Sequence, residues 1–101
     1  MIRHQVTGVV NYGEWRAFLE DFREWNRQAE RVGLPRYRLW GIGFGPVNGF
    51  VAEADFESLD DHVRRLEEAL KDEAFGAIHL KIMSHTVPGS LRDQPLEPEE
   101  V

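Results

Sequence analysis

The chain has 101 residues, and its eighteen acidic and twelve basic side chains give a formal net charge of -6 at pH 7. This length fits one domain, and the acidic balance, with its basic residues scattered, argues against a nucleic-acid partner and an anionic membrane surface. The absence of cysteine excludes disulfides, iron–sulfur clusters, thiolate zinc sites and a thiol nucleophile. We expect one domain over residues 1–96 and an acidic tail over residues 97–101.

The N-terminal residues lack the apolar core of a signal peptide. No apolar stretch approaches the roughly 20 residues that a membrane-spanning helix needs. We therefore expect a cytoplasmic protein with no membrane partner.

The first elements in chain order are a strand and a helix. Residues 2–10 are rich in β-branched side chains and predict the strand. Asn11 and Glu14 form the pattern of a helix cap, while Gly33 and Pro35 predict the end of the helix. Between these signals the apolar residues recur at helical spacing. They are Trp15, Phe18, Leu19, Phe22, Trp25 or Asn26, Ala29 and Val32.

A β-hairpin is predicted from Leu39 to Phe56, with Asn48-Gly49 in its turn, because this dipeptide tolerates the positive φ angles of a type I′ turn. The turn places Val47 opposite Phe50, and directly paired residues share a face. One face is then small and flat, whereas the other is aromatic, aliphatic and acidic. The flat face comprises Leu39, Gly41, Gly43, Gly45, Ala52, Ala54 and Phe56, and the other comprises Arg38, Trp40, Ile42, Phe44, Val51, Glu53 and Asp55.

Ser58 with Asp61 predicts the cap of a second helix. Its expected buried stripe is Leu59, Val63, Leu66 and Leu70. Residues 74–87 fit either a strand, through the alternation of Ile78, Leu80 and Ile82, or a helix, through the spacing of Phe75, Ile78, Ile82 and Met83. Pro88-Gly89 is a break, after which a short last strand is expected.

This order predicts an α+β fold, the ferredoxin-like βαββαβ sandwich with a four-stranded antiparallel sheet and helices on one face. The flat face suits the helices, which leaves the aromatic face uncovered. Because such an apolar patch is large for a monomer, we expect a second copy to cover it and form a homodimer. The paired sheets would enclose a space reached by Glu53, Asp55 and Arg38. The alternative is a solid interface with no usable cavity.

Glu53 is the first candidate catalytic residue, because an apolar surrounding lets a carboxylic acid exchange protons near neutral pH. A structural ion pair with Arg38 or across the dimer is the alternative. Trp40 fits stacking on a planar ligand, although an aromatic side chain at a dimer interface is the commoner explanation.

His62 is the second candidate catalytic residue, with an ordinary surface or packing histidine as the alternative. His79 and His85 are six residues apart, which is about 9 Å along a helix axis and about 20 Å along a strand. Neither spacing lets both ligate one metal ion within a subunit, and His4 has no partner in the sequence pattern. We therefore expect no metal site.

Two motifs resemble those of a known family. Gly45-Pro46-Val47-Asn48 before a strand and Phe56-Glu57-Ser58-Leu59-Asp60 before a helix resemble the Gly-Pro-x-Asn and aromatic-x-Ser-Leu motifs of NIPSNAP-like proteins, members of the dimeric α+β barrel superfamily. Asp72-Glu73-Ala74-Phe75 and the later Val87-Pro88-Gly89-Ser90 are similar to the family's ending, which favours a helix over about 73–86. Ala52 and Ala54 stand where the family often has His and Trp, so any role of those side chains is absent.

The resemblance implies a homodimeric α+β barrel, in a superfamily that includes cofactor-independent monooxygenases, haem-degrading monooxygenases and small isomerases. Glu53 and His62 resemble a Glu and a His of antibiotic-biosynthesis-monooxygenase-like sequences. The implied function is cofactor-independent monooxygenation or isomerisation of a small planar hydrophobic molecule. Non-catalytic ligand binding, or a stress or interaction module with a sealed dimer interface, is the alternative. The candidate cavity residues are Arg38, Trp40, Phe44 and Val51.

Overall fold

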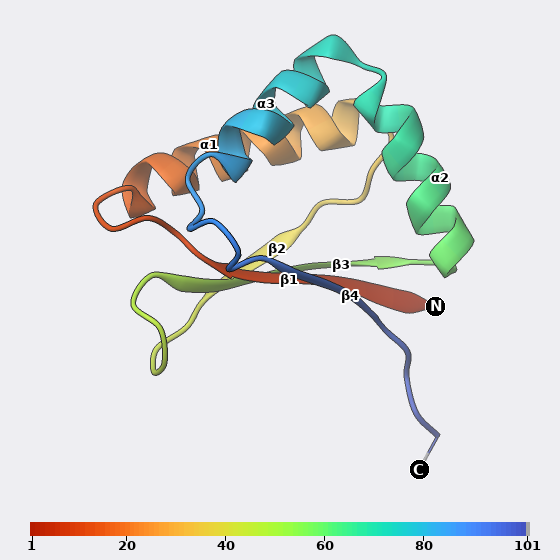
Figure 1. Cartoon of the computed structure of the whole chain (residues 1–101). Coiled ribbons are helices and arrows are strands. Elements are labelled where there is room, and N and C mark those ends of the chain that lie inside the picture. The colour runs from red at the N-terminus through yellow and green to blue at the C-terminus, as the bar shows by residue number, and fades with distance from the viewer. Residues whose placement is uncertain (101) are drawn as a thin grey trace.

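The computed structural model describes residues 1–100, which form a four-stranded sheet with three helices on one face (Figure 1). The strands are β1 (Ile2–Val9), β2 (Arg38–Gly41), β3 (Gly49–Phe56) and β4 (Arg92–Leu96). The helices are α1 (Trp15–Arg31), α2 (Leu59–Leu70) and α3 (Glu73–Met83). All neighbouring strands are antiparallel, in the order β2-β3-β1-β4. The predicted α+β, ferredoxin-like arrangement is confirmed, and the ambiguous segment after residue 73 is mainly helix.

The predicted hairpin register is wrong, although its two faces are correct. Ala52 pairs with Leu39 and not with Gly45, a slip of six residues, and β2 ends at Gly41. Residues 42–48 form a longer loop, closed by a hydrogen bond from the Gly49 N–H to the Pro46 carbonyl. Because the slip is an even number of residues, it leaves every paired side chain on its predicted face.

The core lies between the sheet and the helices. Its buried strand residues come from alternate positions of β1 and β3, and its largest fully buried side chains include Phe18 of α1 and Phe75 of α3. Gly8 of β1 lies beneath two core side chains: a Cβ placed there would be 2.8 Å from Leu91 Cδ2 and 3.0 Å from Phe50 Cε1. This glycine therefore makes room for both.

The predicted helix ends are partly confirmed. Asn11 does not cap α1, because the helix begins at Trp15 and Glu14, in the capping position, forms no side-chain capping bond. Gly33, with a φ of 89°, follows the C-terminal cap of α1 as predicted. Ser58 caps α2 as predicted, since its hydroxyl oxygen accepts a 3.1 Å hydrogen bond from the Asp61 N–H.

The predicted buried stripe of α2 is largely wrong, because of its four residues only Leu66 packs against the core. Leu59, Val63 and Leu70 are 49%, 44% and 42% exposed, whereas the buried residues of this helix are His62 and Ala69. The reason is the position of α2, which lies over one end of the sheet and leaves much of its apolar stripe uncovered (Figure 1). Among the described residues, no helix has the length and apolar character needed to cross a bilayer.

Candidate functional site

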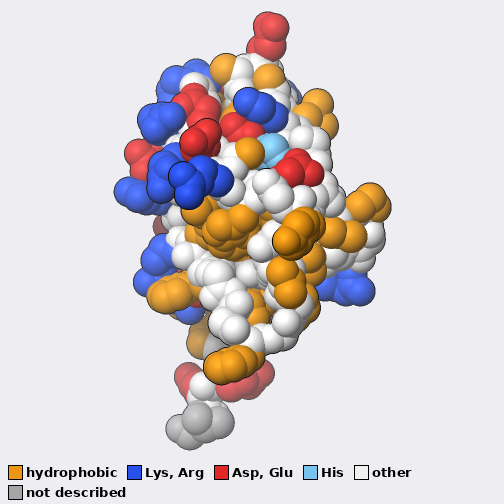
Figure 2. Space-filling view, turned by 90° about the vertical axis from the view of Figure 1, so that its left-hand side faces the viewer, with side chains coloured by type: hydrophobic (Ala, Val, Ile, Leu, Met, Phe, Trp, Pro, Cys, Tyr) orange, Lys and Arg blue, Asp and Glu red, His pale blue; other side chains and the backbone are white. Residues whose placement is uncertain are grey.

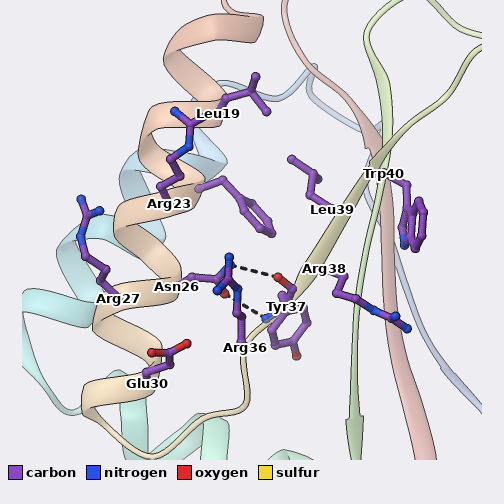
Figure 3. A pocket seen from close by; sticks show the side chains of 11 residues that line it. Leu19, Arg23, Asn26, Arg27, Glu30, Arg36, Tyr37, Arg38, Leu39 and Trp40 are labelled. Atoms are coloured by element: carbon purple, nitrogen blue, oxygen red, sulfur yellow. Dashed lines mark hydrogen bonds between the residues drawn. The ribbon is translucent and has the colours of Figure 1, made fainter.

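A groove of about 630 Å³ lies between α1 and the edge strand β2 (Figure 3). We call it the α1–β2 groove. Leu19 and Phe22 of α1 and Leu39 of β2 give it an apolar surface. Charged side chains also line it, namely Arg23, Arg27, Glu30, Arg36 and Arg38.

Asn26 and Tyr37 fix the distance between the two walls of the groove. The Tyr37 N–H donates to Asn26 Oδ1 at 2.9 Å, and Asn26 Nδ2 donates to the Tyr37 carbonyl at 3.0 Å (Figure 3). Asn26 is buried, so this pair of bonds satisfies both ends of its amide. The segment leading into β2 is thereby held against α1.

The groove is locally basic in a protein that is acidic overall. Arg27 forms an ion pair with Glu24, whereas neither Arg23 nor Arg36 forms one within residues 1–100. Figure 2 shows Lys and Arg side chains along one side of the molecule, interspersed with Asp and Glu side chains and next to hydrophobic side chains. A smaller groove of about 350 Å³ shares Leu19 and Arg23 with the first and extends this surface towards Trp15.

A buried polar chain starts at Tyr37. Its hydroxyl lies 2.5 Å from His4 Nδ1, and His4 Nε2 contacts the carboxylate of Asp93. These partners assign a tautomer in which His4 Nε2–H donates to Asp93 and Nδ1 accepts from the phenol. Burial, reinforced by the charge of Asp93, raises the pKa of Tyr37, so its hydroxyl stays protonated at neutral pH.

His62 packs against this chain from α2. Its ring lies 4.0 Å from that of His4 and 4.7 Å from that of Phe56, measured between centroids. His62 Nε2 is buried and has no hydrogen-bond partner among the described residues. Burial, followed by the effect of His4, lowers the pKa of His62, which therefore favours its neutral form.

The structure brings four of the six predicted site residues to one face. Glu53, Val51, Arg38 and Trp40 occupy paired positions on the sheet face that no helix covers. Arg38 and Trp40 also border the α1–β2 groove, but their side chains point away from α1 (Figure 3). The Arg38 guanidinium lies 5.8 Å from the Trp40 ring centroid.

The other two predicted site residues lie elsewhere. Phe44 is in the 42–48 loop with 98% of its surface exposed, and His62 is on the helix-covered side of the sheet. The sheet therefore separates His62 from Glu53. Glu53 is 13% exposed in its side chain, accepts a 3.3 Å hydrogen bond from Gln5 and lies 3.8 Å from Arg3. Its ionic partner is thus Arg3, and not Arg38 as one alternative proposed.

Sequence reasoning missed the Tyr37–His4–Asp93 chain and the Asn26 clamp. His4 and Asp93 are 89 residues apart, and only the pairing of β1 with β4 brings them together. No local spacing predicts such a contact. The sequence shows that Asn26 lies at a helical spacing, but it does not show that Tyr37, beyond the end of the helix, is the partner of its amide.

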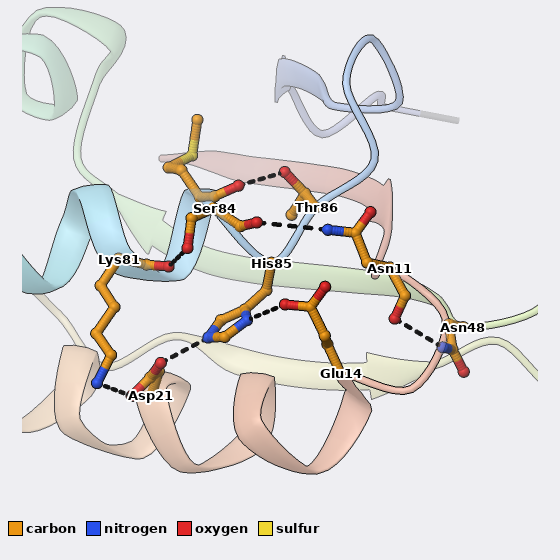
Figure 4. Close-up of polar contacts among 9 residues, drawn as sticks. Asn11, Glu14, Asp21, Asn48, Lys81, Ser84, His85 and Thr86 are labelled. Atoms are coloured by element: carbon orange, nitrogen blue, oxygen red, sulfur yellow. Dashed lines mark hydrogen bonds and ion pairs between the residues drawn. The ribbon is translucent and has the colours of Figure 1, made fainter.

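A second polar cluster joins α1 to the end of α3 (Figure 4). His85 lies between two carboxylates, with Nδ1 2.8 Å from Glu14 Oε1 and Nε2 2.7 Å from Asp21 Oδ2. Lys81 adds a 3.3 Å ion pair to Asp21. Burial opposes a charge on His85, but the two carboxylates outweigh it and raise the pKa of His85.

Asn11 connects the loops beside this cluster (Figure 4). Its N–H donates to the His85 carbonyl at 2.7 Å, and its own carbonyl accepts from Asn48 Nδ2 at 3.4 Å. Its side-chain amide donates to the Ser84 carbonyl. Within residues 1–100 no three His, Asp or Glu side chains are grouped as a metal site.

The fold matches solved structures over nearly the whole chain. A NIPSNAP family protein from Agrobacterium tumefaciens has a TM-score of 0.80 and 22% identity, over 98% of this chain and 86% of that one. An uncharacterised NIPSNAP domain protein from Burkholderia xenovorans has a TM-score of 0.79 and 16% identity, over 98% and 95%. An antibiotic biosynthesis monooxygenase has a TM-score of 0.74 and 15% identity, over 99% and 100%.

No protein-family model and no curated protein sequence matches the chain. The likeness is therefore one of structure at low sequence identity. It agrees with the resemblance carried by the Gly-Pro-x-Asn and aromatic-x-Ser-Leu motifs. This chain has the fold shared by NIPSNAP family proteins and antibiotic biosynthesis monooxygenases.

Proposed function

We propose that this protein binds a small, planar, mainly hydrophobic molecule with an acidic group in the α1–β2 groove. The observation that carries the proposal is the placement of Arg23 and Arg36, without acidic partners among the described residues, beside the apolar side chains of the groove. Guanidinium groups bind carboxylates and phenolates through charge-assisted hydrogen bonds and stack on planar rings. A volume of about 630 Å³ suits a ligand of this size.

A titration with 2-naphthoate tests this proposal, with uncharged naphthalene-2-carboxamide as the comparison. Calorimetry is expected to show saturable binding of the acid. Arg23→Gln and Arg36→Gln are each expected to weaken binding of the acid about tenfold, which corresponds to about 1.4 kcal/mol, while changing carboxamide binding little.

Arg64→Gln is the matched control, since this exposed arginine lies on α2 and pairs with Asp61. It is expected to leave binding unchanged. Equal binding of the acid and the carboxamide, or no effect of the two groove variants, would contradict the proposed ligand class.

We also propose that the protein is a homodimer whose uncovered sheet faces pack together. That face carries Trp40, which is 52% exposed, and the partly exposed Val51, beside hydrogen-bonded and ionic pairs such as Gln5–Glu53 and Arg3–Asp55. Such a face with mixed apolar and paired polar groups is typical of a protein–protein interface. Sedimentation velocity at micromolar concentration is expected to give a dimer, and a monomer would refute this proposal.

A second candidate function is cofactor-independent monooxygenation of a small planar hydrophobic molecule between the uncovered sheet faces of the proposed homodimer, where Glu53 lies. It is supported by the fold shared with an antibiotic biosynthesis monooxygenase and by the position of Glu53 on the same sheet face as Trp40 and Val51. In such a reaction a substrate CH₂ becomes C=O, O₂ supplies one oxygen atom to the product and one to water, and the substrate provides the four electrons. Glu53 and His62 remain predicted catalytic residues, with isomerisation as the alternative reaction.

Oxygen uptake separates this second candidate from simple binding. The probe is 1,8-dihydroxyanthrone, a planar phenol with an oxidisable CH₂ group. Oxygen consumption in excess of the protein-free rate is expected under the oxygenase proposal, and Glu53→Gln is expected to abolish that excess without lowering the melting temperature. If the probe binds and no oxygen is consumed above the protein-free rate, the oxygenase proposal is refuted and only the binding function stands.

A further inference from the structure

The chain has two tyrosines, and they lie in very different surroundings. Tyr12 is 93% exposed, whereas Tyr37 is 7% exposed and lies between the core and the α1–β2 groove. The Tyr37 ring meets the ring of Trp25, which is also buried, edge to face at 5.0 Å between centroids. In a chain without cysteine, tyrosine and tryptophan are the side chains that most readily give up a single electron. The fold therefore places two oxidisable rings in contact beside a groove.

The Tyr37 hydroxyl has a proton acceptor within hydrogen-bond distance. Its oxygen lies 2.5 Å from His4 Nδ1, and His4 Nε2 contacts a carboxylate oxygen of Asp93. The Asp93 side chain is 67% exposed, so this chain of polar groups runs from a buried phenol to the protein surface. If His4 took up a proton on Nδ1, its positive charge would be held by a charge-assisted hydrogen bond to that carboxylate.

The surroundings of Tyr37 oppose a charge on its ring. Burial, followed by the negative charge of Asp93, raises the pKa of Tyr37, so a phenolate is disfavoured. Loss of an electron without a proton would leave a positively charged phenol, which burial disfavours as well. If the electron and the proton leave together, the ring stays uncharged. The buried phenol and its imidazole partner therefore favour the coupled loss over either separate step.

We infer that Tyr37 is a redox-active tyrosine, which gives one electron to an oxidant in the α1–β2 groove while its phenolic proton passes to His4 Nδ1. The class of oxidant is a one-electron oxidant such as an organic peroxyl radical. The O–H bond of Tyr37 breaks and an N–H bond forms on His4, which leaves a neutral tyrosyl radical and an imidazolium beside Asp93. The peroxyl radical gains the electron and, with a proton from solvent, becomes a hydroperoxide. This step does not depend on the binding of an aromatic acid proposed above.

Hexachloroiridate(IV) is the probe that tests the electron transfer, because it takes up one electron and its negative charge suits the arginines of the groove. Tyr12→Phe leaves Tyr37 as the sole tyrosine. Freeze-quenching of this variant after mixing with the oxidant is expected to give the electron paramagnetic resonance signal of a tyrosyl radical. The signal is expected to be absent from the Tyr12→Phe/Tyr37→Phe protein, which measures any contribution from tryptophan radicals.

His4→Gln, made in the Tyr12→Phe protein, tests the proton transfer. Glutamine can accept a hydrogen bond from the phenol but does not take up its proton, so a merely structural role of His4 would be retained. Formation of the tyrosyl radical in stopped flow is expected to be about a hundredfold slower, as for the loss of a positioned general base. His79→Gln is the matched control, since His79 is hydrogen-bonded to Trp25 and not to Tyr37, and it is expected to leave the rate unchanged.

A solvent isotope effect and a second variant complete the test. Radical formation in the Tyr12→Phe protein is expected to be slower in D₂O than in H₂O, because a proton moves in the same step. If thermal unfolding shows that His4→Gln is not folded, Asp93→Asn on the exposed strand β4 replaces it, and is expected to slow the reaction by removing the charge that holds the imidazolium.

Two results would overturn the inference. One is a Tyr12→Phe protein whose signal does not exceed that of the double variant, which would show that Tyr37 gives up no electron. The other is a folded His4→Gln or Asp93→Asn protein that forms the radical at the unchanged rate, which would show that His4 accepts no proton in the step. Failure of 2-naphthoate to bind would refute the proposed ligand class and leave the redox role of Tyr37 standing.

Discussion

At the scale of single residues, the histidines show how position decides protonation. Burial lowers the pKa values of His62 and His79, whereas two carboxylates raise the pKa of His85. Trp25 Nε1 donates to His79 Nδ1, which is consistent with a neutral ring. Histidine titration therefore contributes to stability with opposite signs at different sites.

His85→Gln is expected to destabilise the protein most at acidic pH. The raised pKa of His85 means that the folded state binds its proton more tightly than the unfolded state does. That stabilisation is fully present below the ordinary pKa of 6.5 and is lost as the pH rises through the folded value. Urea unfolding is expected to show a larger free-energy loss at pH 5.5 than at pH 8.5. Equal losses at both pH values would show that His85 carries no linked proton.

His62→Leu is expected to change the pH dependence in the opposite direction. Because the pKa of His62 is lowered, the unfolded state takes up a proton below about pH 6.5 that the folded state resists. The wild-type protein is thus expected to lose more stability than the variant between pH 7.5 and pH 5.5. Urea unfolding at both pH values measures this difference, and His85→Gln serves as the control of opposite sign. If the unfolding free energies of the wild type and the variant change equally between the two pH values, the lowered pKa of His62 is contradicted.

The sequence identified some of these residues but not their partners. Glu53 and Trp40 were placed on the uncovered face because alternation along a strand is visible in the sequence. The contact of His4 with Tyr37 and Asp93 depends on three segments that only the folded chain brings together. The catalytic roles of Glu53 and His62 stay predictions.

At the scale of elements, periodicity predicted faces better than it predicted lengths. The alternation in β2 and β3 survived a register slip of six residues because the period of a strand is two. The turn itself was misplaced, since Asn48 does have a positive φ of 62° but at the end of a longer loop. For α2, helical periodicity identified an apolar stripe, yet the sequence contained no information on whether another element would cover it.

Gly8→Ala is expected to destabilise the fold by about 1–3 kcal/mol, the usual range for overpacking a core. The new methyl group would be 2.8 Å from Leu91 Cδ2, so β1 or its neighbours must shift. Gly43→Ala is the matched control, because nothing lies within 4 Å of its added Cβ. Thermal unfolding of both variants checks the difference, and equal melting temperatures would show that Leu91 and Phe50 move aside freely.

At the scale of the whole molecule, the sheet divides the protein into a packed side and an open side. The order of the elements and the two faces of the strands were enough to predict this division from the sequence. The α1–β2 groove was not predicted, because it depends on the angle between a helix and an edge strand that Asn26 and Tyr37 set. The open side is the part of the fold on which the proposed homodimer depends.

Val51→Glu is expected to dissociate the proposed homodimer. The substitution places a charge at the middle of the uncovered face without touching the core, whereas Val63→Glu places the same charge on the exposed stripe of α2. Sedimentation velocity is expected to show a monomer for the first variant and a dimer for the second. Dissociation by both variants, or by Val63→Glu alone, would contradict the proposed interface and would indicate one on the helical side of the protein.

The hydrogen bonds of Asn11 have a consequence for motion. They join the start of α1, the 42–48 loop and the end of α3 at one end of the protein. Three loops that are distant in sequence are therefore unable to fluctuate independently, and the opening of one breaks bonds that order the other two. We therefore expect amide hydrogen exchange at this end to follow a single shared opening event, in which Val10 and Asn11 lose protection at the same rate.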